Sequence, residues 1–411
     1  MLGLVLTAAL SSGCGSLLEV KAPSRVDADS LEQPRNAALM VAGAISDLEC
    51  ALGRYIVGAG LVGDEFQDAQ LASAMWPYDQ RTFTSEGGQY ASSTCNEGAI
   101  GIYTPLSTAR WQADNALAKL EAWTDTEVPS RASLIAKAAA YSGYSHVLMG
   151  EGMCSAAFDL GPELTRAEVF ARAEDRFTTA LDAARAVGET AIENLALVGR
   201  ARTRLNLGRK SEAAADASLV PVGFVLNATY SGTAARRENP IFTRNIRDGS
   251  ITIEDDFRNL TFGGVVDPRV NVTYVGISRS DNITPLWSQS KYTSVASPIP
   301  MATWDEAQLI IAEAALGQTA VDIINMFHTR AGLPAFSSSD DNAIMAQIVQ
   351  ERSRELFLES HHLGDKIRYD LPFTPAPGTP YPPKAGGSYG SLTCFPLPDV
   401  ERLNNPNIGG G

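Results

Sequence analysis

The chain has 411 residues, of which 45% are hydrophobic and 19% charged, and its formal net charge is −14 with an isoelectric point near 4.8. This length and composition indicate a globular protein with one large domain or two to three smaller ones. The acidic balance argues against nucleic acid or an anionic membrane surface as the main partner, and it leaves neutral and polar ligands open.

The first residues have the pattern of an export signal. Residues 1–10 (MLGLVLTAAL) form an apolar run that is too short to cross a bilayer, and small residues and Cys14 follow it. We therefore predict a secretory signal over residues 1–13. The small residues before Cys14 resemble a bacterial lipobox, although Leu10 stands four places before the cysteine instead of three. Cys14 would then be lipidated and residues 14–30 would be a tether. The alternatives are a plain signal peptide and a buried helix that happens to precede a cysteine.

The remaining cysteines are Cys50, Cys95, Cys154 and Cys394. An even number in an exported chain permits disulfides, and four cysteines allow three pairings. The sequence contains no CxxC pair and no His-rich cluster, so we expect neither a metal site nor a cofactor.

Helical periodicity dominates the chain. It predicts a helix over residues 31–52, then helices over 105–123, 131–150, 165–187 and 191–207 and a shorter one from Ser211. Alanine and glycine recur where these helices would touch, which is typical of close-packed pairs similar to tetratricopeptide units. We predict a mainly α fold of tetratricopeptide-like helical hairpins, with the array at about residues 104–219.

Two stretches interrupt the helical pattern. Residues 60–88 are rich in turn formers and aromatics and are predicted to be loop laid over the scaffold. Residues 220–300 lose the helical period, and we predict a long irregular, loop-rich subdomain there with a functional role. Helices return over residues 303–363, and a Pro-rich tail over 371–411 is expected to run extended along the surface.

Residues 350–370 (QERSRELFLESHHLGDKIRYD) combine dense charge with a helical apolar stripe. In a single helix beginning near Ser339, Arg352, Glu355 and Glu359 would lie close enough to pair. A charge on a buried face is costly unless it is paired, which predicts a structural ion network of Arg352, Glu355, Glu359, Asp365 and Arg368. The alternative is a catalytic pair, Glu355 and Glu359. Carboxylates four residues apart on one helix point the same way and do not flank a glycosidic bond.

Several separated stretches resemble, in order, the SusD/RagB family of outer-membrane nutrient-binding lipoproteins. They are Cys14 and residues 113–115, 201–208, 306–314, 325–334, 350–368 and 397–406. The resemblance implies a helical scaffold with an irregular subdomain, here residues 31–411. It also implies a position on the outer face of the outer membrane and partnership with a SusC-like TonB-dependent transporter. Ser360 stands where the family usually has Gly, and Gly364 where an aromatic residue is common.

Family ligand sites vary, so the resemblance transfers no binding residues. Sugars present flat C–H faces to aromatic rings and hydroxyls to polar groups, and one loop holds both kinds of side chain. Its ligand-binding candidates are Trp76, Tyr78, Asp79, Arg81, Asp64 and Glu65. A tryptophan in a Pro-containing loop can instead anchor that loop.

We predict a non-enzymatic surface lipoprotein that binds a glycan or another small nutrient and delivers it to the transporter. The alternatives are an exported glycoside hydrolase and a tetratricopeptide-like protein-assembly lipoprotein that recognises peptides.

Overall fold

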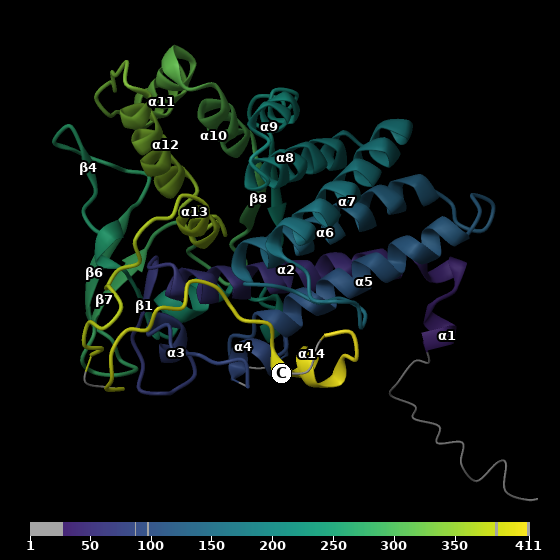
Figure 1. The fold of residues 1–411 in the computed structure, drawn as a ribbon, viewed down its shortest axis with the longest axis horizontal. Helices are drawn as coiled ribbons and strands as arrows, with labels where there is room; N and C mark the ends of the chain where they lie inside the picture. Colours follow the sequence, from purple (N-terminus) through teal and green to yellow (C-terminus); the bar gives the residue numbers. More distant parts are fainter. Residues whose placement is uncertain (1–27, 87, 97, 383–384, 409–411) are drawn as a thin grey trace, which may run out of the picture.

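The computed structural model describes residues 28–408 apart from 87, 97 and 383–384. Cys14, the predicted signal and most of the predicted tether lie outside the described residues. The fold is mainly α, as predicted, with long helices packed side by side; most of the short strands lie at one end, whereas β8 lies beside α8 (Figure 1). Within the described part of the chain, no helix is long and apolar enough to cross a membrane.

The scaffold consists of long helices in which neighbours in sequence pack together (Figure 1). They are α2 (Ala37–Val62), α5 (Tyr103–Ala122), α6 (Arg131–Gly152), α7 (Arg166–Val187), α8 (Thr190–Asn206) and α9 (Lys210–Ala217). Short helices accompany them: α1 (Ala28–Leu31), η1 (Pro34–Asn36), α3 (Trp76–Asp79) and α4 (Gln89–Ser92).

Local signals set the ends of α7. Thr165 accepts a hydrogen bond from the Glu168 backbone, and the Glu168 side chain bonds back to the Thr165 N–H, which completes a capping box. Gly188 ends the helix with φ of 71°, a conformation that glycine adopts without steric cost. The structure thus agrees with the predicted helix over 165–187.

Small residues allow the close helix packing that the sequence indicated. Phe177 of α7 lies between Gly143 of α6 and Gly199 of α8. A Cβ at Gly143 would stand 2.7 Å from the Phe177 ring, and one at Gly199 would collide with it. The two glycines therefore make room for a fully buried aromatic ring.

Helix α2 extends ten residues beyond the predicted end at Leu52, so the prediction of a loop from Gly60 was partly wrong. The glycines in this part of α2 allow close packing and do not break the helix. A Cβ at Gly53 would lie 2.7 Å from Pro240, and one at Gly60 would lie 2.7 Å from Phe66. Tertiary contacts thus override the local preference of glycine for turns.

The strands form two-stranded antiparallel sheets. They are β1 (Phe66–Asp68) with β3 (Ile251–Ile253), β2 (Val225–Ala228) with β8 (Ile299–Thr303), β4 (Thr261–Phe262) with β5 (Val265–Val266) and β6 (Val272–Ile277) with β7 (Pro285–Gln289). Short helical turns lie between them: η2 (Ala235–Arg237), the π-helix η3 (Phe242–Arg247) and η4 (Asp255–Phe257). The β2–β8 pair joins the two ends of the stretch that was predicted to be irregular.

The C-terminal helices are α10 (Trp304–Ala315), α11 (Gly317–Ala331), α12 (Asp341–Glu355), α13 (His362–Arg368) and α14 (Asp399–Asn404). The prediction of one continuous helix through residue 363 was wrong. Leu358 and Ser360 have φ of 57° and 74°, so the chain turns between α12 and α13. This turn brings the Leu358 N–H to the Glu65 side chain, at 3.1 Å. Glu359 therefore does not share a helix with Arg352 and Glu355.

After α13 the chain runs as an extended tail across the molecule to α14 (Figure 1). Near its end, Phe395 exchanges backbone hydrogen bonds with Gly152 and Cys154, both at 2.9 Å. A disulfide joins Cys154 to Cys394, and a second joins Cys50 to Cys95. The structure thus selects one of the three possible pairings and fastens the tail to the end of α6.

Candidate functional site

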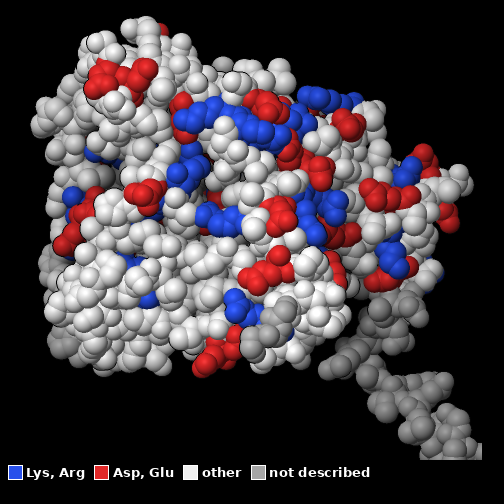
Figure 2. All heavy atoms as spheres, viewed as in Figure 1, with Lys and Arg blue, Asp and Glu red and all other residues white. Residues whose placement is uncertain are grey.

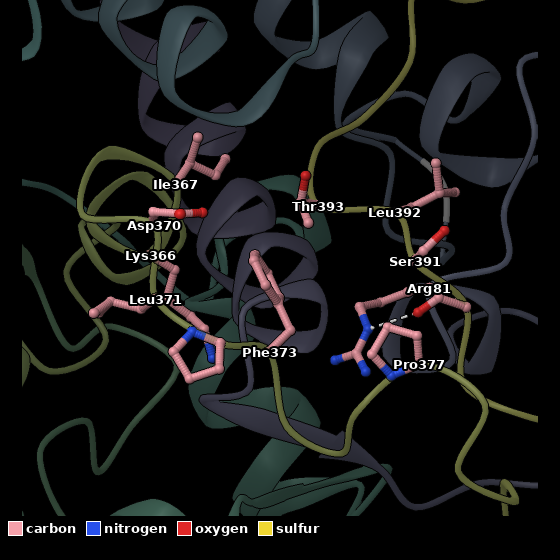
Figure 3. A pocket seen from close by; sticks show the side chains of 12 residues that line it. Arg81, Lys366, Ile367, Asp370, Leu371, Phe373, Pro377, Ser391, Leu392 and Thr393 are labelled. Carbon is pink, nitrogen blue, oxygen red and sulfur yellow. Dashed lines mark hydrogen bonds between the residues drawn. The ribbon is translucent and has the colours of Figure 1, made fainter.

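A cavity of about 330 Å³ lies between the end of α13, the residues that follow it and the later part of the tail. It is lined by Arg81, Lys366, Ile367, Asp370, Leu371, Pro372, Phe373, Pro377, Gly390, Ser391, Leu392 and Thr393. In Figure 3 the α13 side and the tail side face each other, with Phe373 between them. This volume is at the small end of the range for ligand pockets, about 300–1,000 Å³.

A buried ion cluster forms the floor of the cavity. Asp64, just beyond the end of α2, pairs with Arg81 at 2.7 Å and with Lys366. The Asp64 carboxylate also accepts a hydrogen bond from the Thr374 N–H at 2.7 Å. Burial, the largest influence, raises the pKa of Asp64, and the neighbouring Lys366 opposes that rise. One carboxylate therefore holds two cations and the start of the tail together.

Arg81 also fixes the later part of the tail. Its guanidinium donates to the carbonyl oxygens of Thr374, Pro375 and Gly390. The Gly390 N–H donates to the Gln80 carbonyl at 2.7 Å, and a Cβ at Gly390 would collide with the Arg81 carbonyl oxygen. Only glycine lets the tail pass this close to Arg81. Contact between the two backbones therefore positions the wall of the cavity that the tail forms.

Phe373 is the aromatic residue of the cavity. Its ring centre lies 4.7 Å from the Lys366 Nζ and 5.7 Å from the Arg81 guanidinium carbon, both within cation–π range. The half-buried ring is therefore held between two cations that Asp64 holds in turn. Around it, Asp370, Ser391 and Thr393 are exposed. A fixed ring beside hydroxyl and carboxylate groups suits a ligand with an apolar face and polar edges.

Most of the predicted ligand-binding residues are buried inside the protein. Tyr78, Asp79, Arg81, Asp64 and Glu65 are each at most 4% exposed, and Trp76 is half-buried at the start of α3. Of these six residues, Arg81 lines the cavity and Asp64 lies beneath it.

The buried polar side chains of this loop bind other parts of the protein. The Tyr78 hydroxyl donates to the Ile100 carbonyl at 2.7 Å. Asp79 accepts hydrogen bonds from the Asp68 N–H at 2.9 Å and from the Tyr381 hydroxyl at 2.8 Å. The tail covers this loop, which the sequence alone did not indicate.

Buried acids also lie near the cavity floor. Burial raises the pKa of Glu65 to about 7, and burial likewise raises the pKa of Glu254 to about 7. Burial raises the pKa of Asp79 well above its ordinary value. Burial therefore disfavours the charged form of these three carboxyl groups.

The charged residues of the 350–370 stretch pair with other elements instead of along one helix. Arg352 lies 2.8 Å from Asp365, and Arg368 lies 2.9 Å from the other Asp365 oxygen. Glu355 pairs with Arg269 at 3.0 Å and Arg330 at 2.7 Å, and Glu359 pairs with Lys291 at 2.6 Å. Arg368 also pairs with Glu313 of α10. These ion pairs connect α12 and α13 to α10, α11 and the 220–300 stretch.

Sequence reasoning missed the cavity residues Phe373, Asp370, Ser391 and Thr393. One signal was present: Phe373 is an aromatic residue within a stretch that was predicted to run extended on the surface. No signal indicated that residues 390–393 would return to face it. Among the described residues, no group of three or more His, Cys, Asp or Glu side chains could hold a metal ion.

Residues 306–391 match the sequence model of the SusD family, and this segment includes most of α10, all of α11 to α13 and most of the residues that line the cavity. Over this segment the chain is similar to the SusD/RagB family. No curated protein of similar sequence was found.

Solved structures share the fold of this protein at low sequence identity. A SusD-like carbohydrate binding protein from Bacteroides vulgatus matches with a TM-score of 0.68 at 14% identity, over 92% of this chain and 97% of that one. A SusD superfamily protein from Parabacteroides distasonis matches with a TM-score of 0.67 at 12% identity, over 94% and 99%. Surface glycan-binding protein A from Bacteroides uniformis matches with a TM-score of 0.66 at 13% identity, over 91% and 98%. At these identities the likeness establishes the fold.

Proposed function

We propose that this protein binds a glycan or another small nutrient in the cavity beside Phe373, without chemical turnover. The observation that carries the proposal is the Phe373 ring, held between Lys366 and Arg81 and surrounded by exposed hydrogen-bonding groups. The names of two structural neighbours, a carbohydrate binding protein and a glycan-binding protein, support the same ligand class.

Charge supports a neutral ligand. On the face shown in Figure 2, acidic and basic side chains interleave over α7 to α9, whereas the region over the strands and the tail carries few charges. On these helices Arg200 pairs with Asp216, and Arg204 pairs with Glu174, both at 2.8 Å. The cations of the cavity are already neutralised in part by Asp64. A neutral sugar needs no further counter-charge.

The arrangement of carboxylates supports binding over hydrolysis. Glycoside hydrolysis uses two carboxyl groups, about 5–9.5 Å apart, on opposite sides of the bond. Of the described residues that line the cavity, Asp370 alone carries a carboxylate. Glu355 and Glu359, the candidates for a catalytic pair, are each in ion pairs away from it.

A glycan-binding measurement tests this proposal. Phe373→Ala removes the stacking ring, and we expect it to weaken binding about tenfold, which corresponds to about 1.4 kcal/mol. Phe336→Ala is the matched control, because Phe336 is also half-buried but lies between α11 and α12. Equal affinity of Phe373→Ala and wild type for a bound glycan would contradict the site. Release of shorter sugars by the wild type would contradict binding without turnover.

We further propose that residues 31–411 form one SusD-like domain, anchored through lipid on Cys14 at the outer face of the outer membrane. In this proposal the bound nutrient passes to a SusC-like TonB-dependent transporter. The lipobox-like residues before Cys14 and the match of residues 306–391 to the SusD family support it. Affinity purification from membranes tests it, with wild type compared with Cys14→Ala. A co-purifying TonB-dependent barrel is the expected result, and barrel-assembly proteins in its place would contradict it.

A further inference from the structure

A second cavity, of about 300 Å³, adjoins the first. It is lined by Asp256, Phe257, Leu260, Gln350, Ser353, Arg354, His362, Lys366, Leu371 and Pro372. Three of these, Lys366, Leu371 and Pro372, also line the first cavity. The two cavities therefore lie on either side of one short wall, which residues 371–372 form as the chain leaves α13.

The wall is anchored on both sides. The Leu371 N–H donates to the Lys366 carbonyl at 2.8 Å, which holds the wall against α13. Two residues beyond the wall, the Thr374 N–H donates to Asp64 beneath the first cavity, at 2.7 Å. The Thr374 hydroxyl donates to Asp256 of the second cavity, at 2.9 Å. A wall fixed in this way needs little further ordering when a ligand binds over it.

The top of the wall is open to solvent and apolar. Pro372 is exposed and Leu371 is half-buried. Pro372 has no backbone N–H, so its amide nitrogen leaves no donor unsatisfied when a ligand covers it. A chain that rests on the wall can keep contact with both cavities.

The second cavity, like the first, combines apolar side chains with hydrogen-bonding ones. Phe257 and Leu260 give it an apolar side, while Gln350 and Asp256 are exposed and Ser353 is half-buried. Both of its cations are buried and paired: Arg354 with Asp267 at 3.0 Å, and Lys366 with Asp64. The second cavity therefore offers hydrogen-bonding groups beside an apolar surface, without a cation that needs an anionic ligand.

We propose that the two cavities are adjoining subsites of one groove, which binds consecutive units of a single carbohydrate chain with their linkage over Leu371 and Pro372. The inference rests on the proposed function. Each cavity is near the lower size limit for a ligand pocket, which suits one small unit in each. The groove thus selects chains of at least two units over single sugars, because the second unit gains contacts at little extra entropic cost.

Chain-length series test the groove. The probes are linear gluco-, xylo-, manno- and galacto-oligosaccharides of one to six units, measured by calorimetry, with saturation-transfer NMR for the weakest. For a series that binds, we expect affinity to rise at least about tenfold from one unit to two or three. Ser353→Trp fills the second cavity and should remove this rise. Asn342→Ala, at an exposed position on the same helix, is the control and should behave as wild type.

The outcomes separate the two proposals. Affinity that is independent of chain length, or a rise that survives Ser353→Trp, overturns the groove and leaves binding beside Phe373 standing. A rise that Ser353→Trp removes, with Phe373→Ala weakening every length, supports both. Absence of binding by the wild type to all four series overturns the glycan as the ligand of the proposed function, and the groove with it.

Discussion

Asp64 and Lys366 form a buried ion pair although they are 302 residues apart in the chain. One lies just beyond α2 and the other on α13, and Arg81 completes the cluster from the loop between them. The pair joins the first long helix to the C-terminal helices directly beneath the cavity. The shape of the site therefore depends on the assembly of the whole domain.

Removal of the Asp64 charge tests this dependence. Asp64→Asn leaves Arg81 and Lys366 buried without their carboxylate, and loss of one partner from a buried pair costs about 3–5 kcal/mol. We expect a fall of that size in the free energy of unfolding, measured by urea denaturation, together with weaker glycan binding. Asp370→Asn, at an exposed lining position, should change stability by less than about 0.5 kcal/mol. Equal stability of the two variants would contradict the role of the ion cluster.

Glu65 gives the protein a pH-dependent stability. Its pKa is about 7 in the folded protein, because burial disfavours the charged form, against an ordinary value of 4.5. Its stabilising contribution is therefore fully present below pH 4.5 and is lost as the pH rises to 7. Glu65→Gln cannot ionise and can still accept the hydrogen bond from Leu358. Relative to wild type, we expect the free energy of unfolding of this variant to rise by up to about 3 kcal/mol as the pH increases from 5 to 8.

Glu65→Gln must be compared with wild type at each pH, because two histidines change the stability of both proteins with pH in the opposite direction. Burial lowers the pKa of His146 to about 4 and that of His362 to about 3, so their contribution is lost as the pH falls below 6.5. These contributions cancel between Glu65→Gln and wild type in urea denaturation at each pH. Glu121→Gln, at an exposed position on α5, is the control for the substitution of a carboxylate by an amide. A Glu65→Gln difference that stays constant with pH would rule out the titration of Glu65.

The long helices could be predicted because their signals are local. The capping box at Thr165 and the glycine at 188 set α7 within a residue or so of its predicted ends. Where the structure departs from the predicted helix ends, the cause is contact with distant parts of the chain. Glycines of α2 remain helical because neighbouring side chains occupy the space beside them, and residues 356–361 turn where Leu358 meets Glu65.

The candidate site was less predictable, because three distant segments form it. Arg81, residues 366–373 and residues 390–393 come together through the Asp64 cluster and the close passage of Gly390 along Arg81. None of these segments has the composition of a binding motif by itself. The loop around Trp76 and Tyr78 does have that composition, but the tail covers it.

Phe177 permits a prediction about helix packing. Gly199→Ala places a methyl group against the Phe177 ring, and overpacking of this kind typically costs about 1–3 kcal/mol. Gly43→Ala is the matched control, since Gly43 is exposed on α2 and a Cβ there meets nothing within 4 Å. The free energy of unfolding of that variant should rise by up to about 1 kcal/mol, because alanine has a higher helix propensity than glycine. Urea denaturation gives both values, and a stabilised Gly199→Ala would show that α7 and α8 pack less closely than described.

The disulfides allow stability and binding to be separated. Cys154 and Cys394 close a loop of 240 residues, and the removal of such a link, by replacing both with serine, should cost about 2–5 kcal/mol. Because Thr393 lines the cavity, this variant should also bind glycan more weakly at a temperature where it stays folded. The same change at Cys50 and Cys95 should lower stability but leave affinity unchanged, since neither residue lines either cavity. Calorimetry and thermal denaturation measure the two effects. Equal affinity in the two variants would mean that the cavity keeps its shape without the link between the tail and α6.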